Sequence, residues 1–236
     1  MIANNGMMKK IVKLGLLIMI AASMNACSST MGWKEEVKLN DGRVMVVERH
    51  FNLGGYPTLD AHERTPLDET ISFTLPDSNK KISWKTEFNN RVPALNSLSP
   101  LLLDVIGGIP YLATSPAGCI AYNKWGRPNP PYVLYKYIND EWQRIALKEF
   151  PAVLVHANLI GRPASSLLKP YYNLEAAKAE REDGNIDDYA KTILREAVKP
   201  WSGCPELVRV EGGWVSPDGG KSPIPIRPRK PIDVKK

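Results

Sequence analysis

Few residues of this chain could carry covalent or acid–base chemistry. Its 236 residues include three cysteines and three histidines. A nucleophilic Cys119, in the stretch SPAGC, would need a histidine base close to it in space, and no local signature pairs it with His50, His62 or His156. The chain also lacks the G-x-S-x-G, H-E-x-x-H, P-loop and dinucleotide-binding motifs. We therefore predict no metal site and no cofactor, and we favour a protein without catalytic activity.

The densest group of acid–base side chains is the stretch DAHERTPLDE, residues 60–69. Here His62 could act as a general base oriented by a carboxylate. The alternative, which we favour, is a solvated loop between strands. A hydrolase that uses His62 or His156 with nearby carboxylates is therefore the alternative hypothesis.

Aromatic residues gather around the stretch GRPNPP, and their rings could bind a ligand by stacking. They are Tyr122, Trp125, Tyr132, Tyr135, Tyr137 and Trp142. Tyr122, Trp125 and Tyr132 are the candidates for stacking on sugar rings or on glycan strands of a cell wall. Aromatic residues are also common in strands, and Tyr135 and Tyr137 alternate as residues on one sheet face do. Packing in a core or an interface is therefore the preferred interpretation.

The start of the chain has the layout of an export signal. Lys9, Lys10 and Lys13 precede a stretch without charge that runs from Leu14 to Met24. A cationic region, a short apolar core and small residues form a secretory signal. The apolar core of about 11 residues is shorter than the roughly 20 residues of a membrane-spanning helix.

The end of this segment, MNAC, carries a more specific feature. Ala26 followed by Cys27 resembles the processing site of bacterial lipoprotein precursors, in which a small residue precedes an obligatory cysteine. The resemblance implies that residues 1–26 are a signal peptide and that Cys27 becomes acylated, which would attach the protein to a membrane. Ser28 resembles the residue found after the cysteine in precursors sorted to the outer membrane. The alternatives are ordinary secretion, with Cys27 left as a thiol, and an uncleaved anchor.

The other two cysteines predict a disulfide. If Cys27 carries a lipid, Cys119 and Cys204 remain as an even pair in an exported chain. They lie far apart in the sequence, so loop-closure entropy alone gives a stabilisation on the order of 4 to 5 kcal/mol. A free nucleophilic Cys119 is the less favoured alternative.

Positive charge is concentrated at the two ends of the chain. The net charge is +6, but the signal lysines and the C-terminal stretch KSPIPIRPRKPIDVKK account for it. The body between them is close to neutral and offers no electrostatic footprint for nucleic acid. The tail, residues 217–236, is predicted to be disordered and extended because of its prolines. Its basic residues could also bind anionic polymers or headgroups.

The rest of the sequence predicts antiparallel hairpins. Two runs at 33–39 and 43–51 flank NDG, a hairpin signal because Asp and Gly tolerate a positive φ. Alternation of apolar and polar residues predicts a second hairpin within residues 69–88. A third hairpin is predicted to turn at Asn139 and Asp140.

Between the hairpins the pattern is less regular. Residues 52–68 are predicted to form a loop, because glycine, proline and charge occur there without a period. The most apolar part of the body predicts a buried helix turn or strand at 101–106. Core strands are predicted at 111–114 and 119–122.

Residues 173–199 are rich in helix formers and predict a helical segment. Gly184 divides this segment, Asn185 can cap the second helix, and Pro200 ends it. The apolar residues of the second helix are spaced to pack one face on a sheet: Ile186, Tyr189, Ile193, Ala197 and Val198. Residues 206–216 are predicted to return to strand.

These features predict an α+β fold that is mainly β, an antiparallel sheet or sandwich of hairpins with a C-terminal helical segment. The expected organisation is a signal peptide (1–26), a lipidated N-terminus with a spacer (27–32), one β-rich domain (33–216) and the tail (217–236). We expect a lipid-anchored protein of the bacterial cell envelope, on the outer membrane and facing the periplasm. It would be a non-catalytic interaction or structural module with an envelope-protein or cell-wall partner and without nucleic acid. A periplasmic hydrolase and a saccharide- or cell-wall-binding protein are the alternatives.

Overall fold

The computed structural model describes six ranges of the chain, residues 30–54, 64–89, 95–183, 187–199, 203–210 and 213–217. The predicted signal peptide (1–26), Cys27 and the predicted tail beyond residue 217 lie outside these ranges. So do His62 and the residues around Asn185. The described residues are mainly β with a few helices, which confirms the predicted fold class.

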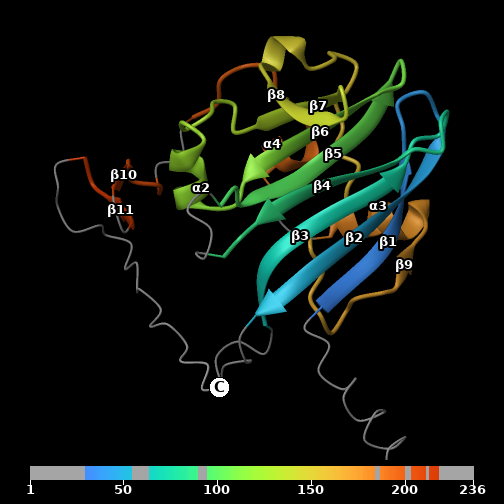
Figure 1. The fold of residues 1–236 in the computed structure, drawn as a ribbon, viewed down its shortest axis with the longest axis horizontal. Coiled ribbons are helices and arrows are strands. Elements are labelled where there is room, and N and C mark those ends of the chain that lie inside the picture. Colours follow the sequence, from blue (N-terminus) through green and yellow to red (C-terminus); the bar gives the residue numbers. More distant parts are fainter. Residues whose placement is uncertain are drawn as a thin grey trace, which may run out of the picture.

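The first sheet has five strands in the order β4-β3-β2-β1-β9 (Figure 1). Its strands are β1 (Thr30–Lys38), β2 (Val44–Gly54), β3 (Thr65–Thr74), β4 (Lys81–Glu87) and β9 (Tyr171–Tyr172). Strands β1 to β4 are antiparallel neighbours, whereas the short β9 pairs in parallel with β1. The first two predicted hairpins are confirmed.

The predicted loop at residues 52–68 is wrong at both of its ends. Strand β2 continues to Gly54 and β3 begins at Thr65. The two ends pair with each other, Asn52 with Asp68 and Gly54 with Thr65. Their backbone groups therefore continue the ladder, although the side chains show no period that would predict it.

The second sheet has four antiparallel strands in the order β5-β6-β7-β8. They are β5 (Leu98–Ile106), β6 (Ile109–Pro116), β7 (Val133–Ile138) and β8 (Glu141–Ile145). The third predicted hairpin, β7–β8, is confirmed, and its turn residues Asn139 and Asp140 have φ of 51° and 66°. Positive φ at both central residues matches the twist of the strands that the turn connects.

The predicted strand at 119–122 is wrong, because these residues begin the helix α2 (Cys119–Lys124). Strand β6 ends at Pro116, and Gly118 then turns the chain with a φ of 104°. The Tyr122 amide donates to the Gly118 carbonyl and starts the helical pattern. Of the residues that suggested a strand, Ala121 and Tyr122 are buried from this short helix.

The helical segment is confirmed in part. Helix α3 (Leu174–Glu182) begins where predicted, and the Asn173 side chain accepts a hydrogen bond from the Ala176 amide at its N-terminus. The second helix is only the single turn α4 (Asp188–Lys191). At Thr192 the backbone becomes extended, and the Leu194 amide donates to the Tyr132 hydroxyl instead of to a helical carbonyl.

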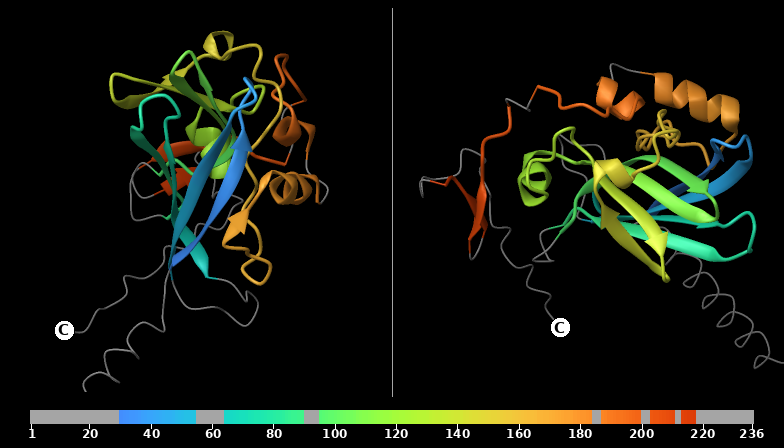
Figure 2. Two further views of the ribbon diagram at one scale, coloured as in Figure 1. Left: turned by 90° about the vertical axis from the view of Figure 1, so that its right-hand side faces the viewer. Right: turned by 90° about the horizontal axis from the view of Figure 1, so that it is seen from above.

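The two sheets pack face to face, and further segments cover what they leave open (Figure 2). The largest apolar cluster joins inner residues of the first sheet, such as Val47 and Ile71, to Leu103 and Leu112 of the second. A second cluster covers the other face of the second sheet, where Leu154 and Ile193 pack on its strands. A third cluster lies under β9 and α3 at the start of β1. The short helix η1 (Leu147–Glu149) and the hairpin of β10 (Val208–Val210) and β11 (Gly213–Val215) complete the described elements.

Side chains occupy the outer edge of β4. The Trp142 indole donates to the Ser83 carbonyl at 2.8 Å, and the Asn96 side-chain Nδ2 donates to the Lys85 carbonyl at 3.1 Å. The Asn96 side-chain oxygen also accepts from the Glu87 amide. These hydrogen bonds bind the backbone groups that an unpaired edge strand would present to another chain.

Candidate functional site

Three charged residues lie on the inner face of the first sheet, in rows that are otherwise apolar. They are Glu35 on β1, Arg49 on β2 and Glu69 on β3, and each alternates with outward-facing neighbours on its strand. Their exposed fractions are 0%, 3% and 2%. We call them the buried charge cluster. Charged groups stay inside a protein only when they are paired and hydrogen-bonded.

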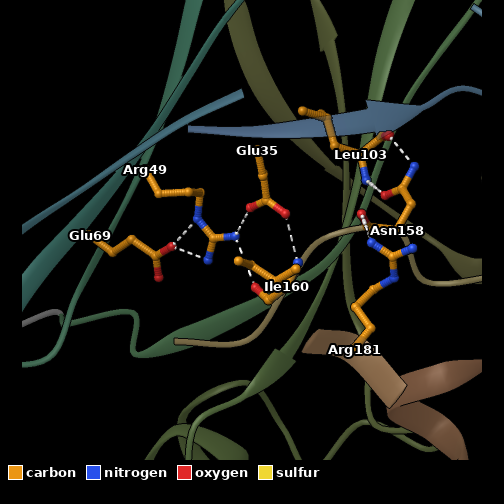
Figure 3. Close-up of polar contacts among 7 residues, drawn as sticks. All are labelled: Glu35, Arg49, Glu69, Leu103, Asn158, Ile160 and Arg181. Carbon is orange, nitrogen blue, oxygen red and sulfur yellow. Dashed lines mark hydrogen bonds and ion pairs between the residues drawn. The ribbon is translucent and has the colours of Figure 1, made fainter. Parts of the chain in front are cut away.

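Arg49 lies at the centre of the buried charge cluster and contacts both carboxylates (Figure 3). Its Nε donates to Glu69 Oε1 at 2.6 Å, and its Nη1 donates to Glu35 Oε1 at 2.8 Å. Its Nη2 forms a further ion pair with Glu69 Oε1. The guanidinium also lies 5.0 Å from the centre of the Trp33 ring. One side chain therefore connects three adjacent strands through charge-assisted hydrogen bonds.

Residues 157–160, which we call the crossover segment, pass over this cluster. The Ile160 amide donates to Glu35 Oε2 at 2.8 Å, and the Ile160 carbonyl accepts from Arg49 Nη1 at 3.1 Å. Ile160 is 125 residues from Glu35 in the sequence. The cluster therefore fixes the path of a distant segment by binding both backbone groups of one of its residues.

Asn158 attaches the same crossover segment to the second sheet (Figure 3). Its Oδ1 accepts from the Leu103 amide and its Nδ2 donates to the Leu103 carbonyl, both at 2.9 Å. Nδ2 also lies 3.3 Å from the carbonyl of Lys38 at the end of β1. Arg181 of α3 donates to the Asn158 carbonyl at 3.0 Å. The side-chain amide of Asn158 thus makes the hydrogen bonds that a neighbouring strand would make at the outer edge of β5.

Burial sets the electrostatics of the cluster. Desolvation raises the pKa of Glu69, although the neighbouring Arg49 guanidinium acts in the opposite direction. Burial would lower the pKa of Arg49, but the Glu69 and Glu35 carboxylates outweigh it and raise that pKa. Arg49 therefore stays charged, whereas burial favours the protonated form of Glu69.

The raised pKa of Glu69 predicts a pH-dependent effect of Glu69→Gln. A folded-state pKa above the ordinary 4.5 means that the folded protein binds more protons than the unfolded chain. This group's contribution to stability is therefore present at low pH and is lost as pH rises from about 4.5 through the folded pKa. Glutamine keeps an acceptor for Arg49 but does not titrate. We expect the free energy of unfolding of E69Q minus that of the unmodified protein to increase with pH over this window.

Urea denaturation at a series of pH values checks this expectation. Glu48→Gln is the matched control, because Glu48 lies on the outer face of the same sheet and pairs with Lys34 and Lys81 at the surface. The pKa of Glu48 is lowered by these lysines, so its difference curve should slope in the opposite direction. A pH-independent E69Q difference would contradict the raised pKa.

The buried charge cluster connects the fold and is closed to substrate. Its three side chains are almost inaccessible, and the crossover segment covers them. A carboxyl with a raised pKa could exchange protons, but a reacting molecule would have to displace the crossover segment to reach it. The geometry therefore indicates that Glu35, Arg49 and Glu69 hold neighbouring strands in position.

The predicted disulfide is confirmed, with Cys119 and Cys204 bonded at 2.02 Å. Cys119 begins α2, and the side chain of Asn123 in the same helix makes hydrogen bonds beside the bridge. Asn123 Nδ2 donates to the Pro205 carbonyl and its Oδ1 accepts from the Leu207 amide, both at 2.9 Å. The bridge and the Asn123 side chain hold the chain just before β10 on the edge of the sandwich.

Two of the three rings predicted as stacking candidates are buried. Tyr122 and Tyr132 have exposed fractions of 3% and 5%. The Arg127 guanidinium lies 4.8 Å from the centre of the Tyr122 ring. The Tyr132 hydroxyl lies within hydrogen-bond distance of the Tyr189 and Thr192 carbonyls, and burial raises its pKa. These contacts favour the packing interpretation.

Trp125, the third candidate, is partly exposed but has partners on several sides. Its Nε1 donates to the Asn96 carbonyl at 2.8 Å, and its ring meets Tyr135 edge-on. Lys124 and Arg144 both lie over the ring, 5.2 and 5.1 Å from its centre. The Trp125 ring therefore makes cation–π contacts with two side chains, which leaves less of its surface for stacking on a sugar.

The acid–base candidates do not converge. His50 and His156 are exposed, and no ion pair within the described ranges includes either of them. His62 lies outside those ranges. The solvated-loop interpretation is wrong for Asp68 and Glu69, which belong to β3. A shallow hollow on the outer face of the first sheet is lined by Val44, Met45, Val46, Glu48, Ser72, Phe73, Thr74, Pro76 and Lys81, and contains no histidine.

Comparison with protein-family models, curated proteins and solved structures finds no match to this chain. In the part of the chain that the structure describes, no group of acidic, histidine and cysteine side chains is arranged to hold a metal ion. None of the helices described there has both the length and the apolar character of a membrane span.

Proposed function

We propose that the protein is a lipid-anchored module of the bacterial cell envelope, acylated at Cys27 and held on the outer membrane facing the periplasm. Its work would be to bind an envelope protein or cell-wall material. The observation that carries the proposal is the sequence pattern of three lysines, a short apolar stretch and then Ala26 and Cys27, which resembles a lipoprotein export signal. The β-rich body then begins almost at once, since Thr30 is already the first residue of β1.

The described contacts support an interaction role over the hydrolase alternative. The buried charge cluster is closed to substrate, and His50 and His156 lie exposed without a carboxylate partner among the described residues. The disulfide between Cys119 and Cys204 fits an oxidising compartment outside the cytoplasm. A saccharide-binding role is less favoured, because Tyr122 and Tyr132 are buried.

Intact mass spectrometry of the membrane-extracted protein tests this proposal. We expect the mass of residues 27–236 plus a diacylglyceryl group and a fatty acyl group. Alkylation should occur only after reduction, because both remaining thiols are in the disulfide. Cys27→Ser is the control and should abolish both lipid additions. A soluble form with a free alkylatable thiol and no lipid would contradict the anchor.

A further inference from the structure

The start of β1 lies very close to the proposed lipid, which restricts how the body can sit on a membrane. Cys27 and Thr30 are three residues apart, and a fully extended chain covers at most about 3.6 Å per residue. Three such steps span at most about 11 Å. An acylated Cys27 therefore holds the first residues of β1 next to the bilayer surface.

The segment from Gly161 to Pro170, which we call the β9 loop, lies at the same end of the body. Strand β9 pairs in parallel with β1, Tyr171 opposite Lys34, and the Lys34 amide donates to the Pro170 carbonyl at 3.0 Å. Because the pairing is parallel, the residues before Tyr171 run toward the start of β1. Figure 1 shows the segment before β9 at the lower end of the molecule, beside the beginning of β1.

The β9 loop has the chemistry of a membrane-contact element. Leu167 is 68% exposed, the largest value among the big apolar side chains that the structure describes. Arg162 and Lys169 are exposed as well, and no acidic residue occurs between Gly161 and Leu174. An exposed apolar residue between basic ones suits a bilayer with anionic headgroups, where the apolar group enters the interface and the cations meet phosphate.

The base of the β9 loop is fixed, so that its tip has a defined direction. Leu168 packs against the apolar cluster that contains Met31 and Trp33 of β1. The backbone amide of Lys169 donates a hydrogen bond to the Tyr172 hydroxyl at 3.0 Å. The Leu167 amide donates to the Ala164 carbonyl at 2.9 Å and forms a turn. Leu168 thus points into the body while Leu167 is presented to the outside.

We propose that the β9 loop is a second membrane contact, in which Leu167 inserts into the interface of an anionic bilayer beside the lipid on Cys27. The proposal rests on the proposed function, because it requires acylation of Cys27. It fixes the orientation of the body, with the start of β1 against the membrane. The turns β1–β2 and β3–β4, at the other ends of these strands, then face away from it.

Leu167→Cys, labelled with a bimane fluorophore, tests this orientation. The substituted residue is the only free thiol expected in the acylated, disulfide-bonded chain. The chain is reconstituted in vesicles of phosphatidylethanolamine and phosphatidylglycerol, with or without lipids brominated along the acyl chain. An inserted interfacial residue lies about 5–10 Å into the headgroup and acyl boundary. We expect a blue shift of the emission and strong quenching by the brominated lipids.

Val153→Cys is the matched control, because Val153 is 52% exposed but precedes Leu154, which covers the far face of the second sheet. Its label should stay unquenched. An acylated chain with an unquenched label at 167, or with equal quenching at both positions, would overturn the orientation and leave the anchor intact. A chain whose mass shows no acyl group would instead overturn the proposed function, and this inference with it.

Discussion

Replacing Arg49 by methionine should lower the free energy of unfolding by about 3–5 kcal/mol, the range measured when one partner of a buried ion pair is removed. The substitution leaves the carboxylates of Glu35 and Glu69 buried without their cation. It also removes the donor to the Ile160 carbonyl, so the crossover segment should loosen as well. Urea denaturation followed by tryptophan fluorescence measures the loss.

Two further variants separate burial from charge. Arg43→Met also removes an arginine that binds two carboxylates, those of Asp41 and Asp77, but these pairs are at the surface. It should leave the unfolding midpoint almost unchanged. A triple replacement of Glu35, Arg49 and Glu69 by apolar residues of similar size should recover most of the stability lost in Arg49→Met. An Arg49→Met protein as stable as Arg43→Met would show that the cluster does not connect the strands.

Removing the disulfide should have the second largest effect. The double substitution Cys119→Ala and Cys204→Ala should lower the free energy of unfolding by about 2–5 kcal/mol, as is typical for a native bridge in a secreted domain. The bridge closes a separation of 85 residues. It fixes the chain before β10 to α2, where Asn123 makes the neighbouring hydrogen bonds.

Reductant provides the internal control for this prediction. Dithiothreitol should destabilise the unmodified protein by about the same amount and leave the double variant unaffected. Asn123→Ala removes only hydrogen bonds of the same attachment, each worth about 1 kcal/mol, and should stay sensitive to reductant. Equal stability of the unmodified protein with and without reductant would contradict a stabilising bridge.

The hairpins could be predicted because their signals are local. Asp41 and Gly42 in the first turn, and Asn139 and Asp140 in the third, tolerate the backbone conformation that a tight turn requires. The alternating runs beside them then determine which residues face inward. The disulfide was equally accessible, because counting cysteines requires no knowledge of the fold.

The errors occur where distant contacts decide the local structure. The chain after Thr192 has helix-forming residues, but the Leu194 amide binds Tyr132 and the Val198 amide binds the Asn129 side chain. These bonds replace the helical ones. The strand predicted at 119–122 is wrong for a similar reason. Gly118 turns the chain with a positive φ, and the helix that follows is held by the disulfide at Cys119.

The buried charge cluster was missed although its residues leave a trace in the sequence. Arg49 alternates in phase with Val47 and Phe51, and Glu69 alternates in phase with Ile71. A charged residue in the apolar phase of a strand indicates an internal partner of opposite sign. The sequence could not identify that partner, because the pairing depends on which strands become neighbours and in which register.

The side chains at the sheet edges have a consequence for how copies of the protein can meet. Asn96 and Trp142 bind the backbone of β4, and Asn158 binds that of β5. A neighbouring molecule could add a strand at either edge only by breaking these hydrogen bonds first. The outer edges of β4 and β5 are therefore protected against edge-to-edge aggregation between copies of the protein.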